Sequence, residues 1–163
     1  MMKIMTKAVA GAVIGLLLSA GYVQADNIYL SITAVKQGML KGEVTQKGLE
    51  GKIAALRFHS EVMSPRDPVT GLPTGKRQHK PLTITKEWGA ASPQLFLALV
   101  TNENLTEVVI DFVGPDPKVP GTMTLSHTVK LTNASVSSIV QSTDMMPNGT
   151  ARQLEDVSFT FQK

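Results

Sequence analysis

The sequence has no cysteine, and only 5% of its 163 residues are aromatic and 18% charged. Without cysteine the chain forms no disulfide, no thiolate zinc site, no cysteine nucleophile and no lipidated N-terminal cysteine. Its charge is too low, and its apolar content of 42% too high, for an intrinsically disordered protein. The length predicts one domain, with room for at most a short appendage.

The N-terminal segment differs in composition from the rest of the chain. Two lysines precede a run of apolar or small residues over 8–21, and a Val-Gln-Ala sequence ending at Ala25 resembles a signal-peptidase site. The apolar run is shorter than the roughly 20 residues of a membrane-spanning helix. We therefore expect a secretory signal peptide at 1–25 and an exported domain at 26–163, with no membrane attachment after cleavage.

This segment also carries much of the positive charge. The whole chain has 16 Lys and Arg against 13 Asp and Glu, a formal net charge of +3. Cleavage after Ala25 removes Lys3 and Lys7, which leaves 14 basic against 13 acidic residues and a net charge of +1. Since nucleic-acid binding depends on clustered positive charge, we expect no nucleic-acid partner.

The pattern after residue 26 is that of a mainly β protein. Apolar and polar residues alternate strictly over 122–132, which is the strongest strand signal in the chain. A break at Asn133-Ala134 separates it from the next strand. The other segments that favour strands are 28–33, 53–62, 79–85, 105–113, 136–140 and 154–161. Short connections between seven strands predict an antiparallel barrel or sandwich rather than βαβ units.

One short helix and two loops complete the predicted elements. Ser92 is a typical N-cap residue with Pro93 at the first helical position, so a helix is predicted over about 93–101. The 36–51 segment contains four glycines and predicts a long loop. Three prolines and two glycines over 64–75 predict a protruding loop.

Residues suited to catalysis or metal binding are sparse. His59, His79 and His127 lie on three different predicted strands, and no metalloprotease, nucleophile-elbow or phosphate-loop motif occurs. Glu107 and Asp111 lie four residues apart on one strand and share a face, which is one arrangement for acid–base chemistry. Their alternation with apolar residues instead favours a solvated strand face. We therefore expect no catalytic residue, no cofactor and no metal site.

Five blocks of sequence occur in an order that resembles one protein family. They read KGE with KGLEGKI, GKRQHKPLTITK, SPQLFLA, KLTNASVSSI and EDVSFTF. The residues that carry the resemblance, called the signature residues below, are Gly42, Glu43, Lys47, Gly48, Glu50, Gly51, His79, Pro81, Lys86, Ser92, Pro93, Leu95, Asn133, Ser135 and Phe159. Together the blocks resemble the haemolysin-coregulated protein (Hcp) family of type VI secretion, over nearly all of 26–163.

The resemblance implies an antiparallel β-barrel of two sheets with one short flanking α-helix. It also implies a non-enzymatic tube subunit that forms homohexameric rings, which stack and are topped by the spike protein VgrG. Effectors carried in the ring lumen would be further partners. The loops at 36–51 and 64–75 would then contact neighbouring subunits, and the signature residues would serve fold and assembly rather than chemistry.

Three features depart from the family pattern. Leu49 stands where the family usually has His, and Val44 where it usually has Ser. The second departure is that the chain stops at Lys163, whereas family members usually continue into one more aromatic-rich strand, so weaker stacking is expected. The signal peptide is the third, because tube subunits of the family are normally loaded from the cytoplasm. The alternative function is therefore an exported periplasmic or secreted β-barrel binding module that kept the fold without building a tube.

Overall fold

The computed structural model describes residues 27–119 and 121–162, so the predicted signal peptide at 1–25 lies outside the described residues. The described part is mainly β with one short helix, as predicted. Its elements in chain order are β1 (Asn27–Ala34), β2 (Gly38–Met39), β3 (Ile53–Ala55), β4 (Arg57–His59), β5 (Val62–Met63), β6 (Gln78–His79), β7 (Leu82–Glu87), α1 (Ser92–Val100), β8 (Leu105–Pro115), β9 (Met123–Met145) and β10 (Ala151–Phe161).

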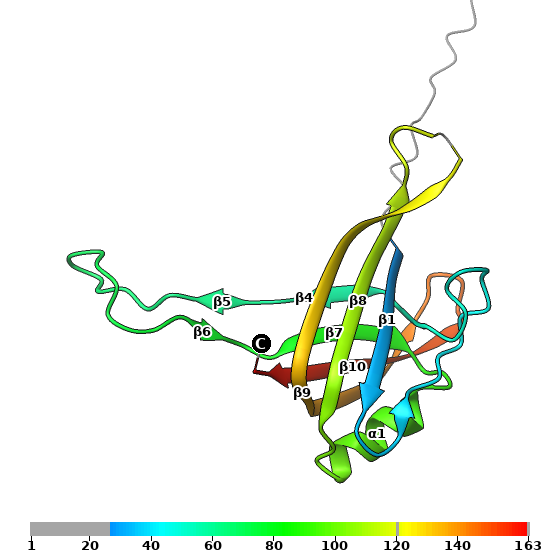
Figure 1. Ribbon diagram of the computed structural model, residues 1–163, viewed down its shortest axis with the longest axis horizontal. Helices are drawn as coiled ribbons and strands as arrows, with labels where there is room; N and C mark the ends of the chain where they lie inside the picture. Colours follow the sequence, from blue (N-terminus) through cyan, green and yellow to red (C-terminus); the bar gives the residue numbers. More distant parts are fainter. Residues whose placement is uncertain (1–26, 120, 163) are drawn as a thin grey trace, which may run out of the picture.

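Two antiparallel layers cross in the body of the molecule (Figure 1). β1, β8 and the first half of β9 form one layer, and the second half of β9 with β10, β7 and β4 forms the other. The layers join on one side through β9. On the other side they join through 53–59, where β3 pairs with β1 and β4 pairs with β7. The sheets therefore close into the antiparallel β-barrel that the resemblance implied.

Strand β9 passes from one layer to the other at Asn133 and Ala134. Ala134 pairs with Leu105 of β8 and also with Phe161 of β10. Asn133 has a φ of 50°, a left-handed conformation that asparagine tolerates better than most residues. The predicted break between two strands was therefore wrong, because these residues bend one continuous strand instead of ending it.

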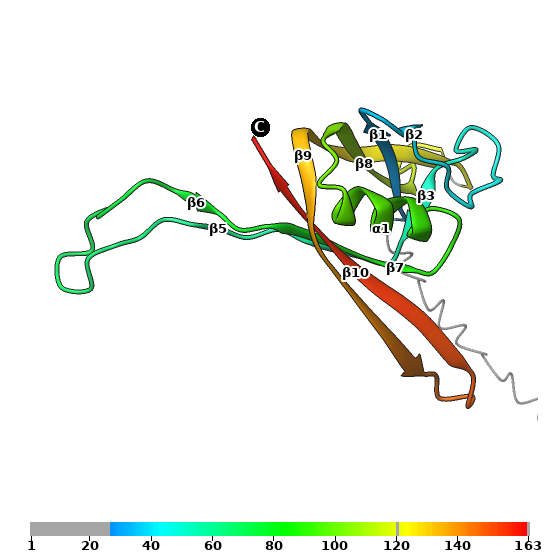
Figure 2. The same ribbon diagram turned by 90° about the horizontal axis from the view of Figure 1, so that it is seen from below.

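The strand predicted over 53–62 is interrupted because this segment serves both layers and then leaves the barrel. At Leu56, between β3 and β4, the backbone N–H donates to the carbonyl of Thr85 at 2.8 Å. Beyond β4 the chain extends away from the barrel as a long hairpin, which carries β5 and β6 and returns into β7 (Figures 1 and 2). We call residues 60–81 the arm. The protruding loop predicted at 64–75 is its outer end.

Alternate residues of the strands fill the barrel with apolar side chains. The fully buried members on β1, β7, β8 and β10 are Leu30, Ile32, Leu82, Ile84, Val108, Ile110, Val157 and Phe159. This period of two is the pattern from which the strands were predicted. The barrel is thus held by one continuous hydrophobic core, to which Leu40 of the 36–51 loop and Ala91 before α1 also contribute, whereas no residue of the arm belongs to it.

Helix α1 packs its inner face against this core. Leu95 and Ala98 are buried, whereas Phe96, Leu97 and Val100 are about half exposed. The helix ends where Asn102 adopts a φ of 48°. In the described part of the chain, no helix is both long enough and apolar enough to cross a membrane.

Candidate functional site

Two signature residues meet a buried carboxylate at the start of α1. Lys86 Nζ of β7 donates to Glu155 Oε1 of β10 at 3.0 Å, and both side chains are at most 1% exposed. Ser92 Oγ donates to the same carboxylate oxygen at 2.7 Å and accepts from the Gly89 backbone N–H at 3.0 Å. The helix N-cap is Ala91, so the predicted capping role of Ser92 was wrong. Its hydroxyl instead ties the start of the helix to two strands.

The signature glycines and acid of the first block shape a folded loop. A Cβ atom on Gly42 would lie 2.1 Å from the Lys52 carbonyl oxygen, so only glycine fits there without a shift of the backbone. Gly42 N–H donates to the Gly51 carbonyl at 2.8 Å, and Glu43 Oε1 accepts from the Ala54 N–H at 3.0 Å. This part of the signature therefore holds the loop predicted at 36–51 against β3.

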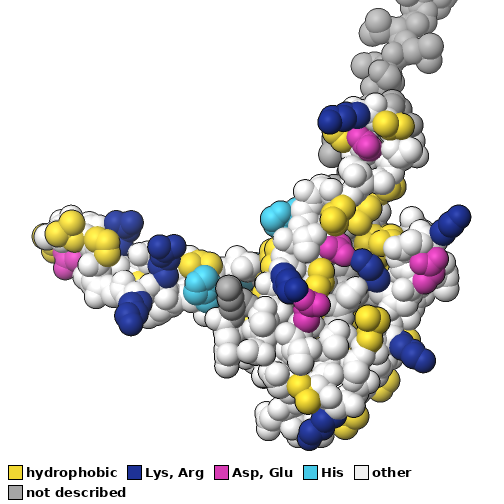
Figure 3. Space-filling view, in the orientation of Figure 1, with side chains coloured by type: hydrophobic (Ala, Val, Ile, Leu, Met, Phe, Trp, Pro, Cys, Tyr) yellow, Lys and Arg dark blue, Asp and Glu magenta, His cyan; other side chains and the backbone are white. Residues whose placement is uncertain are grey.

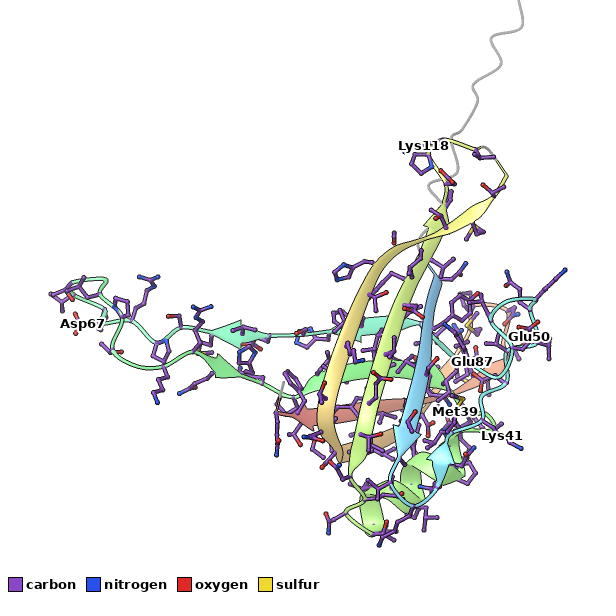
Figure 4. The ribbon with its side chains drawn as sticks, viewed as in Figure 1. Met39, Lys41, Glu50, Asp67, Glu87 and Lys118 are labelled. Atoms are coloured by element: carbon purple, nitrogen blue, oxygen red, sulfur yellow. The ribbon has the colours of Figure 1, made fainter. Side chains whose placement is uncertain are left out.

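The outer end of this loop is exposed to solvent and stands away from the barrel, as the position of Glu50 in Figure 4 shows. Lys47 is exposed, and the Gly48 N–H donates to Glu50 Oε2 at 2.7 Å. Leu49, one of the departures from the family pattern, lines a hollow of about 290 Å³ together with Leu125 of β9. Leu49 thus places an apolar side chain against a partly apolar hollow, at a position where the family usually has a polar residue.

The remaining signature residues serve the core, the bend and the base of the arm. Leu95 and Phe159 are buried in the core, and Asn133 forms the bend of β9. His79 is exposed at the base of the arm, with its ring centre 6.0 Å from that of Phe161. The signature therefore marks residues that hold the fold more than residues that could touch a partner.

The Glu107 and Asp111 carboxylates form ion pairs with two different lysines. Asp111 Oδ2 pairs with Lys52 Nζ at 2.7 Å, and its Oδ1 accepts from Thr128 Oγ1 at 2.8 Å. Glu107 pairs with Lys130 of the adjacent strand. Asp111 is buried, so the predicted solvated face was wrong at that position, because Lys52 from the loop covers it. Each carboxylate thus has its own lysine partner, and the two carboxylates do not act as a pair.

Histidines and acids form no cluster of three that could hold a metal ion within residues 27–119 and 121–162.

Glu103 is a buried carboxylate that the sequence reasoning missed. Its oxygens accept hydrogen bonds from the Lys36 N–H at 2.5 Å, from the Gln37 N–H at 2.9 Å and from the Gln37 side-chain amide at 2.9 Å. Burial raises the pKa of Glu103, but the Gln37 and Lys36 hydrogen bonds and the Lys36 charge outweigh it and lower the pKa below its usual value. A single glutamate after a helix gives no signal in the sequence, because its partners are 66 and 67 residues away.

The arm ends in an organised turn. Asp67 Oδ1 accepts from the N–H groups of Val69 and Thr70 at 2.9 and 2.7 Å, and from the Thr70 hydroxyl at 3.0 Å. Hydrogen bonds from Thr70 and from the Val69 N–H lower the pKa of Asp67. Arg66 and Pro73 form a bridge just behind the turn. The end of the arm therefore has a defined shape although nothing in the barrel packs on it.

The arm also exposes apolar side chains. Val69 is 90% exposed and Leu72 is 64% exposed, and Val62 and Met63 on the shaft are about half exposed. Figure 3 shows apolar and basic side chains together along the arm. Exposed apolar groups grouped on a projecting element are typical of a surface that contacts another protein. The arm is therefore the main candidate for a contact site.

Comparison with known proteins gives one consistent result. A family model described as "Type VI secretion system effector, Hcp" matches residues 29–163. The major exported protein of Pseudomonas aeruginosa is 39% identical over 154 residues, which cover 85% of this chain and 87% of that protein. Among solved structures, a "Crystal structure of Hcp protein" superposes with a TM-score of 0.76 at 24% identity, covering 85% of this chain and 88% of the other. The "Secreted protein Hcp3 from Pseudomonas aeruginosa" has a TM-score of 0.67 at 31% identity, covering 84% and 86%.

Proposed function

The chain belongs to the Hcp family of type VI secretion proteins, and on that premise we propose that it is a non-enzymatic structural subunit that assembles into homohexameric rings. The observation that carries the proposal is the arm, which exposes apolar side chains and ends in an organised turn although the barrel does not cover it. Family membership supports a role in secretion, since the Pseudomonas relative is named a major exported protein.

The distribution of contacts favours assembly over catalysis. The carboxylates that sequence reasoning considered for acid–base work, Glu107 and Asp111, are each neutralised by a separate lysine. The buried Lys86–Glu155 pair is enclosed by the strands and helix that it joins. Charged groups inside the barrel therefore have structural partners, and the surface features that remain are those of an interacting protein.

Ring formation needs two different surfaces on each subunit. A heterologous contact repeats head to tail and closes when the rotation between copies divides a full turn. The arm and the 36–51 loop project in different directions from the barrel (Figure 1), and each would contact a neighbouring subunit. In this function stacked rings would bind the VgrG spike protein at one end and carry effectors in the lumen.

Export through the segment at 1–25 is the second part of the proposal. Cleavage near Ala25 would release the 26–163 domain to the periplasm or the medium. The predicted signal peptide favours a second candidate, an exported β-barrel binding module that kept the Hcp fold and acts as a monomer.

Native mass spectrometry of the purified protein, expressed from the full chain, separates the two functions. The tube-subunit function predicts a hexamer of processed chains at tens of micromolar. A monomer at the same concentration would reject ring assembly and favour the binding module. The mass of each subunit in the same spectrum reports whether residues 1–25 have been removed.

A further inference from the structure

A surface groove lies at the opposite end of the second layer from the arm. It has a volume of about 590 Å³, and its walls come from Glu87 and Trp88 after β7 and from residues of the β9–β10 hairpin between Met146 and Gln153. Strand β7 begins at Leu82 beside the arm and ends at Glu87 in the groove. Figure 2 shows the arm and this hairpin leaving the barrel on opposite sides, and Figure 4 shows Asp67 and Glu87 on opposite sides of the barrel.

The groove presents apolar side chains that the barrel has not buried. Trp88 is 48% exposed, and its indole N–H donates to the Leu154 carbonyl at 3.2 Å, which fixes the orientation of the ring. Met146 in the groove and Met145 beside it are also exposed. A fixed tryptophan beside flexible methionines is well suited to receive apolar side chains of varied shape.

Asp144 of β9, next to the groove, gives this surface an excess of negative charge. Glu87 forms an ion pair with Arg152. Asp144 lies directly opposite Arg152 in the β9–β10 ladder, so the two side chains share a face. Within the described residues Asp144 has no ion pair or hydrogen bond of its own. This surface therefore has two acids against one arginine, and the Asp144 carboxylate is available to a partner.

The end of the arm has the complementary properties. Val69 and Leu72 are its exposed apolar residues. Lys76 and Arg77, which follow the outer end and lead into β6, are exposed and take part in no ion pair within 27–119 and 121–162. The acid at this end, Asp67, is already occupied by the hydrogen bonds of the turn. The arm thus offers two apolar groups and an excess of positive charge.

Two other exposed apolar surfaces match the arm less well. The hollow beside Leu49 is flanked by Lys47 and Lys52, and the only acid in its lining, Asp111, is paired with Lys52. The exposed face of α1 adjoins the turn that carries Lys36, which is exposed. Both surfaces would place lysines against a cationic arm, so charge complementarity favours the groove.

We propose that the end of the arm of one copy docks in the Trp88 groove of a second copy. Val69 and Leu72 pack on Trp88 and Met146, and Lys76 or Arg77 faces Asp144. This inference rests on the proposed assembly function and specifies its contact. Because the arm and the groove are different surfaces at opposite ends of one layer, the contact repeats head to tail instead of closing a pair.

Because the chain contains no cysteine, engineered disulfides give a direct test. Val69→Cys combined with Met146→Cys, introduced into the full chain, should give a ladder of disulfide-linked species under mild oxidation. The matched controls are Val69→Cys alone, which reports arm-to-arm contact, and Val69→Cys with Leu125→Cys, which pairs the arm with the other hollow. Since a disulfide requires Cβ atoms about 4 Å apart, random collision should give little product.

A charge exchange gives an independent measurement. Asp144→Lys should raise the protein concentration needed for assembly at least tenfold. Adding Lys76→Glu with Arg77→Glu should reverse most of this increase. The inference requires the groove-specific ladder or this rescue. Assembled rings with neither result, a disulfide-linked dimer from Val69→Cys alone at the yield of the test pair, or a ladder from Val69→Cys with Leu125→Cys would overturn the inference and leave the proposed function standing. Absence of any assembly in the unmodified protein would reject both.

Discussion

Lys86 and Glu155 face each other inside the barrel with their charged atoms 3.0 Å apart, and neither side chain is more than 1% exposed. The pair joins β7 to β10, and Ser92 adds α1 to it through the shared oxygen Oε1. The other oxygen, Oε2, has no hydrogen-bond partner among the described residues. A charge held in this way stabilises the protein only while its counter-charge is present.

Removal of one partner should therefore be costly. We expect Lys86→Met to lower the free energy of unfolding by about 3–5 kcal/mol, because it leaves a buried carboxylate uncompensated. Urea denaturation followed by circular dichroism measures the change. Lys80→Met is the matched control, since its ion pair with Glu61 is exposed and should contribute less than about 1 kcal/mol. Equal losses in the two variants would contradict the structural role of Lys86.

Gly42 gives a prediction about the close approach of its backbone to that of Lys52. Gly42→Ala places a Cβ atom 2.1 Å from the Lys52 carbonyl oxygen, so the loop must shift, at an expected cost of about 1–3 kcal/mol. Gly75→Ala is the control, because its Cβ atom would meet nothing nearer than 3.9 Å and should leave the stability nearly unchanged. Thermal unfolding compares the two, and a Gly42→Ala protein as stable as the control would show that the loop tolerates the shift.

Glu103 gives a prediction about pH. Its pKa is lowered in the folded protein, so its ionised form stabilises the fold above the unfolded pKa of 4.5. That contribution is lost as the pH falls from 4.5 through the lower folded pKa. Glu103→Gln should therefore lower the Tm at pH 7, and the difference from the unmodified protein should shrink below pH 4.5. Glu50→Gln, at an exposed loop position, is the control. A Tm difference that stays constant from pH 7 to pH 3 would contradict the prediction.

Asp67 organises the end of the arm without contributing to the barrel. Asp67→Ala should remove the hydrogen bonds to Val69 and Thr70, and trypsin should then cleave the arm at least several-fold faster. The Tm of the barrel should not change, because the arm lies outside the core. Asp116→Ala alters the turn between β8 and β9 and should leave cleavage of the arm unaffected. Unchanged cleavage in Asp67→Ala would show that the turn does not need the carboxylate.

The signal peptide that we propose at 1–25 gives a prediction about the N-terminus of the exported protein. N-terminal sequencing of exported protein should begin at Asp26. Protein that begins at Met1 and stays in the cytoplasm would contradict cleavage and agree with the usual loading of tube subunits.

Much of the barrel could be predicted from the sequence because its strands bury one face. The alternation over 122–132 and the apolar residues of β1 and β8 indicated strands directly. The alternation of apolar and polar residues shows which face of a strand is buried, but not where one strand ends and the next begins. It therefore did not reveal that β9 continues through Asn133. For the same reason it did not divide 53–62 between two layers.

The candidate site was less predictable because its parts come together only in the folded chain. Ser92 has the residue type of an N-cap, but its position beside Glu155 depends on a strand 63 residues away. Glu103 gave no signal for a similar reason. The arm was predicted from proline and glycine content, whereas the groove requires the ends of β7 and of the β9–β10 hairpin to be adjacent.

The bend in β9 has a mechanical consequence. A sandwich of two separate sheets resists sliding only through the side chains packed between them. Here a single backbone belongs to both layers, from Met123 in one to Met145 in the other, and the segment 53–59 joins them again on the far side. A force that shears one layer across the other must therefore stretch covalent chain at two corners, so the barrel should transmit a push along its length without coming apart.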